Sequence, residues 1–427
     1  MTDIKNNMTA SKMYERSISL PRGTLDLTYQ TNFSGDSKNY ELEDLLGFAQ
    51  RINPKRAFLF VSKVLGRHIP VAPGTMRHAF TDLANLVPDD LPEPILVIGM
   101  AETAVGLSAG VHQALQTRYP NALLLNSTRH SQHNKNNTET LLTTFSEDHS
   151  HASQHLIYQS ADTVTQAQLL ASKTLIMVDD EASTGNTCVN VVTALRNAGL
   201  TELEQVHLTT LVDWSLNQNQ AQADVDDNIS ARLPNIDFHR HHLLSGAWQW
   251  TDAPNPEPIT MPSVDTTEAG SYALGDTGNW GRFPTLDSTD GFAFYLTKFQ
   301  AAFNLFNQQA QSEKASFEKE QLPQRILVLG SNEFVWLPFL LAEWLETQTQ
   351  NATVKFSALT RSPIALGGAI TTMLSFSDNY GLGMTNFAYN VEPSDWDLIV
   401  LCVETSADSV DEMWKDLDNV LVVSPTL

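Results

Sequence analysis

The sequence predicts an α/β protein in which a parallel sheet flanked by helices is followed by a second, smaller α/β domain. Short apolar runs with the length of buried parallel strands lie at residues 94–100, 174–178 and 206–213. Segments with helical spacing follow the first two runs, and this strand–helix–strand order is typical of parallel sheets with right-handed crossovers. A segment rich in Pro, Gly, Asp and Thr, residues 250–285, separates this half from a second set of such patterns.

The first half of the chain is expected to alternate strands and helices after a polar, irregular segment at residues 1–35. Residues 126–155 interrupt this alternation, because their Asn, Thr, Ser and His content is typical of a loop or a long mobile hairpin. The expected elements are strands at 57–61 and 94–100, a helix at 107–115, a strand at 174–178, a turn at 179–185, a helix at 186–197 that Gly199 ends, and a strand at 206–213.

The second half repeats this alternation on a smaller scale. The expected elements are a helix at 292–311, a strand at 325–329, a helix at 334–345, and strands at 354–359 and 398–403. The chain is thereby divided into an irregular segment at 1–35, a first domain at 36–250, a linker at 251–285 and a second domain at 286–427.

Composition excludes several classes of function. The net charge of −23 argues against nucleic-acid binding, which requires a basic surface. No apolar run approaches the roughly 18 residues of a membrane span. The polar N-terminus argues against secretion. The two cysteines, Cys188 and Cys402, lack CxxC partners, so we expect free thiols, no structural zinc and a cytoplasmic location.

The segment at residues 174–187, TLIMVDDEASTGNT, contains the most informative pattern in the chain. Asp179 and Asp180 stand at the end of the apolar strand, and small and hydroxyl residues follow at the start of a helix. The unpaired N–H groups and positive end of a helix N-terminus bind phosphate, and Gly185 permits close backbone approach. The two carboxylates suit the hydroxyl groups of a ribose. A pentose phosphate satisfies both halves of the pattern; the alternative is an ordinary strand–turn–helix with a capping Asp. A Walker A loop is excluded because the Gly-Lys-Ser/Thr ending is missing.

This segment resembles the PRPP (5-phosphoribosyl 1-diphosphate) motif of type I phosphoribosyltransferases, of which orotate phosphoribosyltransferase is a familiar example. The resemblance implies the type I fold for the first domain, with Asp179 and Asp180 on the ribose. It also implies Mg²⁺ held through PRPP, with these two acids as the only candidate protein ligands. The implied 5-phosphate loop consists of Ala182, Ser183, Thr184, Gly185, Asn186 and Thr187. Because the chain is so acidic, an anionic ligand must be held by local N–H groups, a few Lys or Arg side chains and Mg²⁺.

Three further segments match the family at lower specificity. The diphosphate loop corresponds to Ala101, Glu102, Thr103 and Ala104, where an acidic residue is unexpected; the alternative is a plain turn. Residues 126–155 occupy the place of the family's flexible loop, so Arg129, His149 and His151 are candidate catalytic groups; the alternative is a solvated His-rich loop or an adventitious metal site. Lys63, Arg67 and His68 lie where the family's hood recognises the acceptor; the alternative is surface charge beside a strand.

The sequence Thr360-Arg361-Ser362-Pro363 after an apolar run resembles the signature of the TRSP domain, which follows a phosphoribosyltransferase domain in bacterial proteins linked to tellurite-resistance and stress genes. Tyr380 and Asn390 belong to further matching segments, although Leu359 stands where another Thr is expected. At a strand end, Thr360, Arg361 and Ser362 suit a phosphate or a carboxylate; the alternative is a capped turn with a structural ion pair. The glycine pairs at 367–368 and 381–383 lack the context of a dinucleotide site.

The resemblance implies transfer of ribose 5-phosphate from PRPP to a nucleobase-like acceptor with release of diphosphate, possible service in making a nucleoside-like metabolite under stress, and a homodimer. Two alternatives stay open: a non-catalytic PRPP-binding regulatory protein, and a PRPP-dependent hydrolase or lyase assisted by the second domain. Neither membrane nor nucleic acid is an expected partner.

Overall fold

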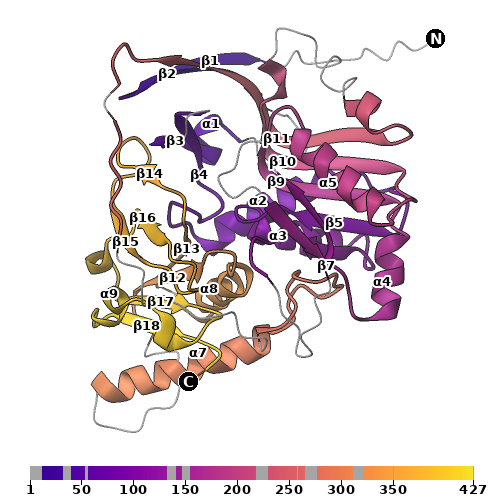
Figure 1. Ribbon diagram of the computed structural model, residues 1–427. Helices are drawn as coiled ribbons and strands as arrows, with labels where there is room; N and C mark the ends of the chain where they lie inside the picture. Colours follow the sequence, from indigo (N-terminus) through magenta and orange to yellow (C-terminus); the bar gives the residue numbers. More distant parts are fainter. Residues whose placement is uncertain are drawn as a thin grey trace, which may run out of the picture.

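The computed structural model describes residues 12–31, 40–52, 56–131, 141–146, 154–217, 229–256, 258–264, 277–310, 322–349 and 351–426. Its largest element is a seven-stranded sheet with the order β1-β2-β11-β10-β9-β5-β6 (Figure 1). The strands are β1 (Met13–Leu20), β2 (Gly23–Thr31), β5 (Ile95–Gly99), β6 (Leu123–Asn126), β9 (Thr174–Ala182), β10 (Gln205–Asp213) and β11 (Asp237–Asp252).

The centre of this sheet is parallel, as the sequence predicts, because β5, β6, β9, β10 and the first half of β11 run in one direction. Fully buried apolar residues fill β5 and the first five positions of β9, in keeping with a sheet covered on both faces. Helices α2 (Pro73–Asn85), α3 (Val105–Leu115), α4 (Thr163–Leu170) and α5 (Asn186–Asn197) belong to the same domain, and α3 packs on β5, β6 and β9. Strand β9 continues to Ala182, so the turn that we expected at residue 179 begins four residues later, at Ser183.

The expectation of an irregular segment at residues 1–35 was wrong over residues 13–31. These residues form the antiparallel hairpin β1–β2, and β2 pairs with the second half of β11 from Leu244 to Asp252. The sequence does carry a signal for this hairpin. Leu25, Leu27 and Tyr29 alternate with polar residues and are buried, which is the two-residue period of a strand with one covered face.

The second domain contains a parallel four-stranded sheet with the order β13-β12-β17-β18. Its strands are β12 (Arg325–Ser331), β13 (Thr353–Leu359), β17 (Leu398–Cys402) and β18 (Val420–Val423), and its helices are α7 (Phe292–Ala310), α8 (Trp336–Gln348) and α9 (Glu412–Lys415). A small hairpin of β15 (Met373–Ser377) and β16 (Thr385–Tyr389) is added. The fold is therefore α/β in both domains, with the smaller sheet in the second (Figure 1).

A three-stranded sheet joins the two domains. Strands β3 (Leu46–Arg51) and β4 (Phe58–Ser62) follow the short helix α1 (Leu42–Leu45), and β14 (Ile364–Ala365) of the second domain pairs antiparallel with β3. A further bridge links Val71 to Phe356. The first residues of β14 come directly after Pro363, so this pairing places the TRSP segment beside the first domain.

The end of the expected linker is part of the folded core. The Asn126 N–H donates to the Gly281 carbonyl at 2.7 Å, and Leu124 and Thr285 form a backbone bridge. Trp280 is 3% exposed and packs against Phe334. Residues 281–285 therefore lie along the β6 edge of the large sheet, where backbone pairing prevents them from acting as a free linker.

The described part of residues 126–155 is a hairpin rather than an open loop. Strands β7 (Leu141–Ser146) and β8 (Gln154–Tyr158) pair antiparallel. None of the helices that the structure describes is long and apolar enough to span a membrane.

Candidate active site

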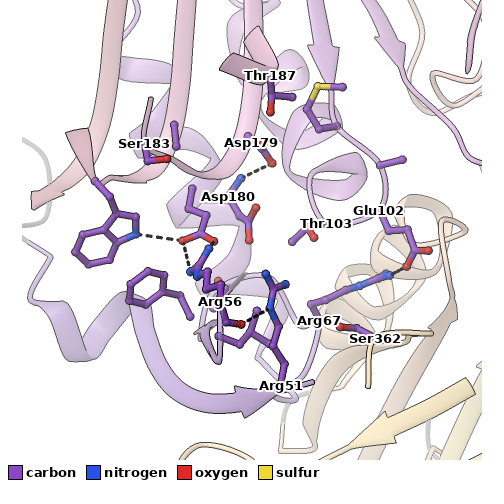
Figure 2. Close-up of a pocket in the computed structure, with 18 of the residues that line it drawn as sticks. Arg51, Arg56, Arg67, Glu102, Thr103, Asp179, Asp180, Ser183, Thr187 and Ser362 are labelled. Atoms are coloured by element: carbon purple, nitrogen blue, oxygen red, sulfur yellow. Dashed lines mark hydrogen bonds and ion pairs between the residues drawn. The ribbon is translucent and has the colours of Figure 1, made fainter. Parts of the chain in front are cut away.

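A cavity of about 620 Å³ lies at the carboxyl ends of β5 and β9, where parallel sheets commonly bind ligands (Figure 2). Most of the residues that the sequence singles out line it. These are Arg67, His68, Ala101, Glu102, Thr103, Arg129, Asp179, Asp180, Ala182, Ser183, Thr184, Gly185, Asn186, Thr187, Thr360, Arg361 and Ser362. One cavity thus brings together segments of both domains.

The two acids at the end of β9 project into this cavity. The Asp180 backbone N–H donates to Asp179 Oδ1 at 3.0 Å, which fixes the Asp179 carboxylate. Burial, and then the negative charge of Glu181, raise the pKa of Asp180 above its usual range. A carboxylate with a raised pKa gains free energy when a ligand supplies hydrogen-bond donors or a cation, so the acid pair is suited to ribose hydroxyls and Mg²⁺.

The next acid along the strand has a structural role. Glu181 accepts hydrogen bonds from Arg56 Nη1 at 2.6 Å and Nη2 at 3.1 Å, and from the Trp214 indole at 3.1 Å (Figure 2). These bonds satisfy the carboxylate of Glu181 inside the protein. Of the three consecutive acids, Asp179 and Asp180 are therefore the pair available to a ligand.

The loop after the acids leads into helix α5 and lines the cavity. Gly185 is the residue before α5 and has φ 77°, the left-handed conformation that glycine adopts most readily. A Cβ at this position would lie 2.7 Å from Ile229 Cδ1 and 3.1 Å from Arg240 Nη2. Ser183 and Thr184 are exposed to the cavity. The loop therefore presents hydroxyls and the N-terminus of a twelve-residue helix to one point, which is the arrangement that binds a phosphate.

The diphosphate loop follows β5, and its Ala101–Glu102 peptide bond is cis. Ala101, Glu102 and Thr103 line the cavity. Ala104 does not, because it is fully buried at the start of α3, where its N–H donates to the Met100 carbonyl at 2.9 Å. Ala104 is thus a correction to the predicted loop: it lies at the start of the helix, and of the four loop residues only the three before it line the cavity.

Glu102 is held by two arginines that come from different domains. Its carboxylate contacts Arg67 through Oε2 and Arg361 through Oε1, with a further Arg361 Nε contact at 3.0 Å. Burial alone would raise the pKa of Glu102, but the positive charges of Arg67 and Arg361 outweigh it and lower that pKa to about 2. Glu102 is therefore ionised at neutral pH and offsets part of the positive charge at this side of the cavity.

Of the candidates in the flexible-loop segment, Arg129 lines the cavity. Its backbone N–H donates to Glu333 Oε1 at 2.9 Å, and its Nη2 lies 3.5 Å from His155 Nε2. His155 is buried, and its Nδ1 lies 3.0 Å from Ser127 Oγ. His149 and His151 fall outside the described residues, so their proposed roles stay predictions.

Two of the three hood candidates line the cavity, and the third does not. Arg67 and His68 line the cavity, and burial followed by the charge of Arg67 lowers the pKa of His68 to about 3, so this imidazole is neutral at neutral pH. Lys63 is not part of the site. Its Nζ donates to the Glu43 carbonyl at 2.8 Å, and Lys63 does not line the cavity, although its neighbour Ser62 does.

Three of the five second-domain candidates line the cavity. Thr360, Arg361 and Ser362 line the cavity, but Tyr380 and Asn390 do not. The Tyr380 hydroxyl donates to Glu404 Oε1 at 2.7 Å and its ring stacks on His130. Asn390 has φ 55° and donates to the His68 carbonyl at 2.8 Å. Asn390 therefore supports the cavity wall through His68, whereas the contacts of Tyr380 lie with residues outside the cavity lining.

Several cavity residues were not predicted from the sequence. Arg51, Glu181, Trp214 and Trp248 also line the cavity, and Arg56 stacks over Phe60 at 4.7 Å. Burial, and then the charge of Arg56, lower the pKa of Arg51. A signal was available for Glu181 alone, as the third acid of a run. The others come from strand ends that only the folded chain brings together.

Among the described residues, no cluster of three or more His, Cys, Asp or Glu side chains is placed to hold a metal ion. The two carboxylates at the end of β9 fit an ion that takes most of its ligands from a phosphorylated substrate and water.

Comparison with known families gives two matches. Residues 45–246 match a family model described as a phosphoribosyl transferase, and residues 298–420 match one described as a TRSP domain C-terminal to that transferase. Comparison with curated proteins gave no match.

Solved structures with a similar fold include adenine phosphoribosyltransferases. The enzyme from Leishmania tarentolae has a TM-score of 0.32 at 13% identity and covers 48% of this chain and 85% of its own. The enzyme from Trypanosoma brucei, in complex with AMP, pyrophosphate and ribose-5-phosphate, has a TM-score of 0.31 at 12% identity. This match covers 53% of this chain and 86% of that enzyme. The enzyme from Giardia lamblia, complexed with 9-deazaadenine, has a TM-score of 0.28 at 11% identity. This match covers 47% of this chain and 96% of that enzyme.

Proposed function

Because this chain belongs to the phosphoribosyl transferase family that carries a C-terminal TRSP domain, we propose that it transfers ribose 5-phosphate from PRPP to a nucleobase-like acceptor, releasing diphosphate. The observation that supports this most strongly is the arrangement at the end of β9. Asp179 and Asp180 face the same cavity as the loop around Gly185, so a sugar and its 5-phosphate can be held together.

The charges around the cavity suit the two ends of PRPP. Asp179 and Asp180 would accept hydrogen bonds from the 2- and 3-hydroxyls, while the helix N-terminus and hydroxyls beyond Gly185 would hold the 5-phosphate. The diphosphate would lie along Ala101–Thr103, near Arg67, Arg129 and Arg361. We propose that Mg²⁺ is the cofactor: Asp179 and Asp180 are the residues that would hold it, and it would supply positive charge that offsets the charge of the diphosphate.

The chemistry asks the protein mainly for position and electrostatic stabilisation. As the bond from C1 to the diphosphate lengthens, negative charge grows on the leaving group and positive charge on the ribose. Arginines at the diphosphate loop stabilise the first, and the carboxylates at the end of β9 stabilise the second. His68 is neutral, so it can donate or accept a hydrogen bond without adding charge to the cavity.

Three finer expectations, the first two implied by the family resemblance and the third by the cysteine content, stay proposals. They are a nucleoside-like product made in a stress response, a homodimer, and a cytoplasmic location.

The double variant Asp179→Asn/Asp180→Asn tests the proposal. It is expected to weaken PRPP binding by about 100-fold or more, because two charge-assisted contacts each contribute roughly 1.5–3 kcal/mol. Titration calorimetry with PRPP and Mg²⁺ measures the affinity, and circular dichroism checks that the fold is retained. Wild-type affinity in a folded double variant would contradict the assignment.

Product analysis separates the reaction classes. With PRPP, Mg²⁺ and a panel of nucleobases, diphosphate release that requires a base supports transfer. Release without any base indicates a hydrolase, and tight binding with no release across the panel indicates a regulatory PRPP-binding protein.

A further inference from the structure

A buried ion cluster joins the two domains at the diphosphate loop. Glu102 lies between Arg67 of the first domain and Arg361 of the second, and the side chains of these three residues are 9%, 5% and 11% exposed. Arg67 Nη1 also donates to the Asn332 carbonyl of the second domain at 2.5 Å. In Figure 2, Glu102, Arg67 and Ser362 lie together at one side of the cavity, away from Asp179 and Asp180. The contact between domains is therefore part of the cavity wall.

A second carboxylate completes this cluster. Glu333, at the end of β12, accepts from Thr128 Oγ1 at 2.5 Å and from the Arg129 N–H at 2.9 Å. Three arginines (Arg67, Arg129 and Arg361) thus face two glutamates, which leaves one net positive charge in a protein whose total charge is −23. This excess lies at the wall where a leaving diphosphate would carry its charge.

We propose that Arg361, from the second domain, is a ligand of the PRPP diphosphate, and that Glu102 is the resting counter-ion that it exchanges for this diphosphate. The inference rests on the proposed function and extends the substrate site into the second domain. Guanidinium groups form two parallel hydrogen bonds with phosphoryl oxygens as readily as with carboxylates. A diphosphate carries several negative charges, so it competes effectively with the single charge of Glu102.

The exchange explains why an acidic residue stands in an anion loop. Two arginines buried without a counter-ion would be costly in the empty protein. The Glu102 carboxylate removes this cost while keeping both guanidinium groups in place beside Ala101 and Thr103. Arg361 is a substrate ligand in this scheme, and Glu102 is a positioning residue.

The scheme predicts effects of opposite sign for two variants. Arg361→Gln removes a ligand and is expected to weaken binding of inorganic diphosphate with Mg²⁺ by about 10- to 100-fold. Glu102→Gln removes the competing charge and is expected to tighten it several-fold, by about 3- to 10-fold. Titration calorimetry on the full chain measures both. Arg325→Gln is the matched control, because Arg325 forms an exposed ion pair with Asp397 at 2.6 Å and does not line the cavity.

A purely structural role for the cluster would give a different pattern. Both variants would then weaken binding together, and this result, or an unchanged affinity in Arg361→Gln, would overturn the inference. If Glu102→Gln does not fold, Glu102→Asp replaces it, since its shorter side chain draws the carboxylate away from Arg361 and should also tighten binding. Arg361→Lys, which keeps the charge and loses the two-pronged geometry, should recover part of the affinity.

Failure of the proposed function is distinguishable from failure of this inference. A wild-type chain that binds neither PRPP nor diphosphate contradicts the proposed function itself. A wild-type chain that binds both, with Arg361→Gln equal to it, contradicts the role of Arg361 alone.

Discussion

Asp180 shows how neighbouring side chains prepare a single group for its ligand. Burial is the main cause of the raised pKa of Asp180. The negative charge of its neighbour Glu181 raises this pKa further, although Glu181 is paired with Arg56. In the empty cavity this carboxyl group takes up a proton more readily than an exposed aspartate does. Hydrogen-bond donors and Mg²⁺ bind its ionised form in preference to its protonated form, so ligand binding favours release of that proton.

The pH dependence of PRPP binding follows from this shift. Because the pKa is raised in the free protein, affinity is expected to be full above that pKa and to fall as the pH is lowered through it, from about pH 8 towards about pH 5. Titration calorimetry at several pH values measures the slope. The phosphate groups of PRPP titrate in the same way with the wild-type protein and with the Asp180→Asn variant. The difference between the two pH profiles therefore reports the contribution of Asp180. Equal slopes in the two proteins would remove Asp180 from the binding equilibrium.

At the scale of elements, α5 and the loop before it form the unit that holds the 5-phosphate. The sequence places the start and the end of this helix correctly at Asn186 and Asn197. Glycines with positive φ stand at both ends, Gly185 at 77° and Gly199 at 116°. The first lies in the cavity and the second does not, although both adopt a backbone conformation that an L side chain avoids.

This symmetry allows a matched test of the loop. Gly185→Ala is expected to lower PRPP affinity by about 10-fold or more, because the new Cβ would crowd Ile229 Cδ1 and Arg240 Nη2 and displace the loop. Both substitutions should lower the free energy of unfolding by roughly 1–2 kcal/mol. Gly199→Ala should leave PRPP affinity unchanged. Denaturant unfolding and calorimetry compare the two variants. Equal affinities would show that the loop tolerates a side chain and does not enclose a phosphate.

For the whole molecule, the main structural fact is that the two domains share one hydrophobic core. Phe80 of α2 packs on Trp336 and Phe339 of α8, and Phe339 packs on Phe356 of β13. Together with the β14–β3 pairing, this contact continues the core of the first domain into the second, beside the buried ion cluster around Glu102. Domains joined in this way are expected to unfold together.

Phe339→Ala tests this coupling. Phe339 is 1% exposed, so its truncation is expected to lower the free energy of unfolding by about 3–5 kcal/mol. Differential scanning calorimetry should show one transition in the wild-type chain and one transition at lower temperature in the variant. Two transitions, of which only the second-domain one moves, would contradict a shared core.

The sequence by itself determined the elements and the chemistry that are local. Apolar runs predicted β5, β9, β10, β12, β13 and β17, and the spacing of Asp179, Asp180 and Gly185 predicted the strand–loop–helix site. Such features depend on residues within one or two turns of chain. Other strands, among them β1, β2, β6 and β11, were not predicted from the sequence. In β2 the polar composition hid an apolar alternation that becomes clear only once one face of the sheet is seen to be covered.

Only the tertiary structure decided which distant segments meet. Lys63 and Arg67 are four positions apart, yet one donates to a carbonyl outside the cavity and the other reaches Glu102. Arg361 lies 259 positions from Glu102, and no local pattern could pair them. Their contact is set by the β14–β3 pairing and by the packing of α8 on α2, which arise from burial of apolar surface shared by the whole chain.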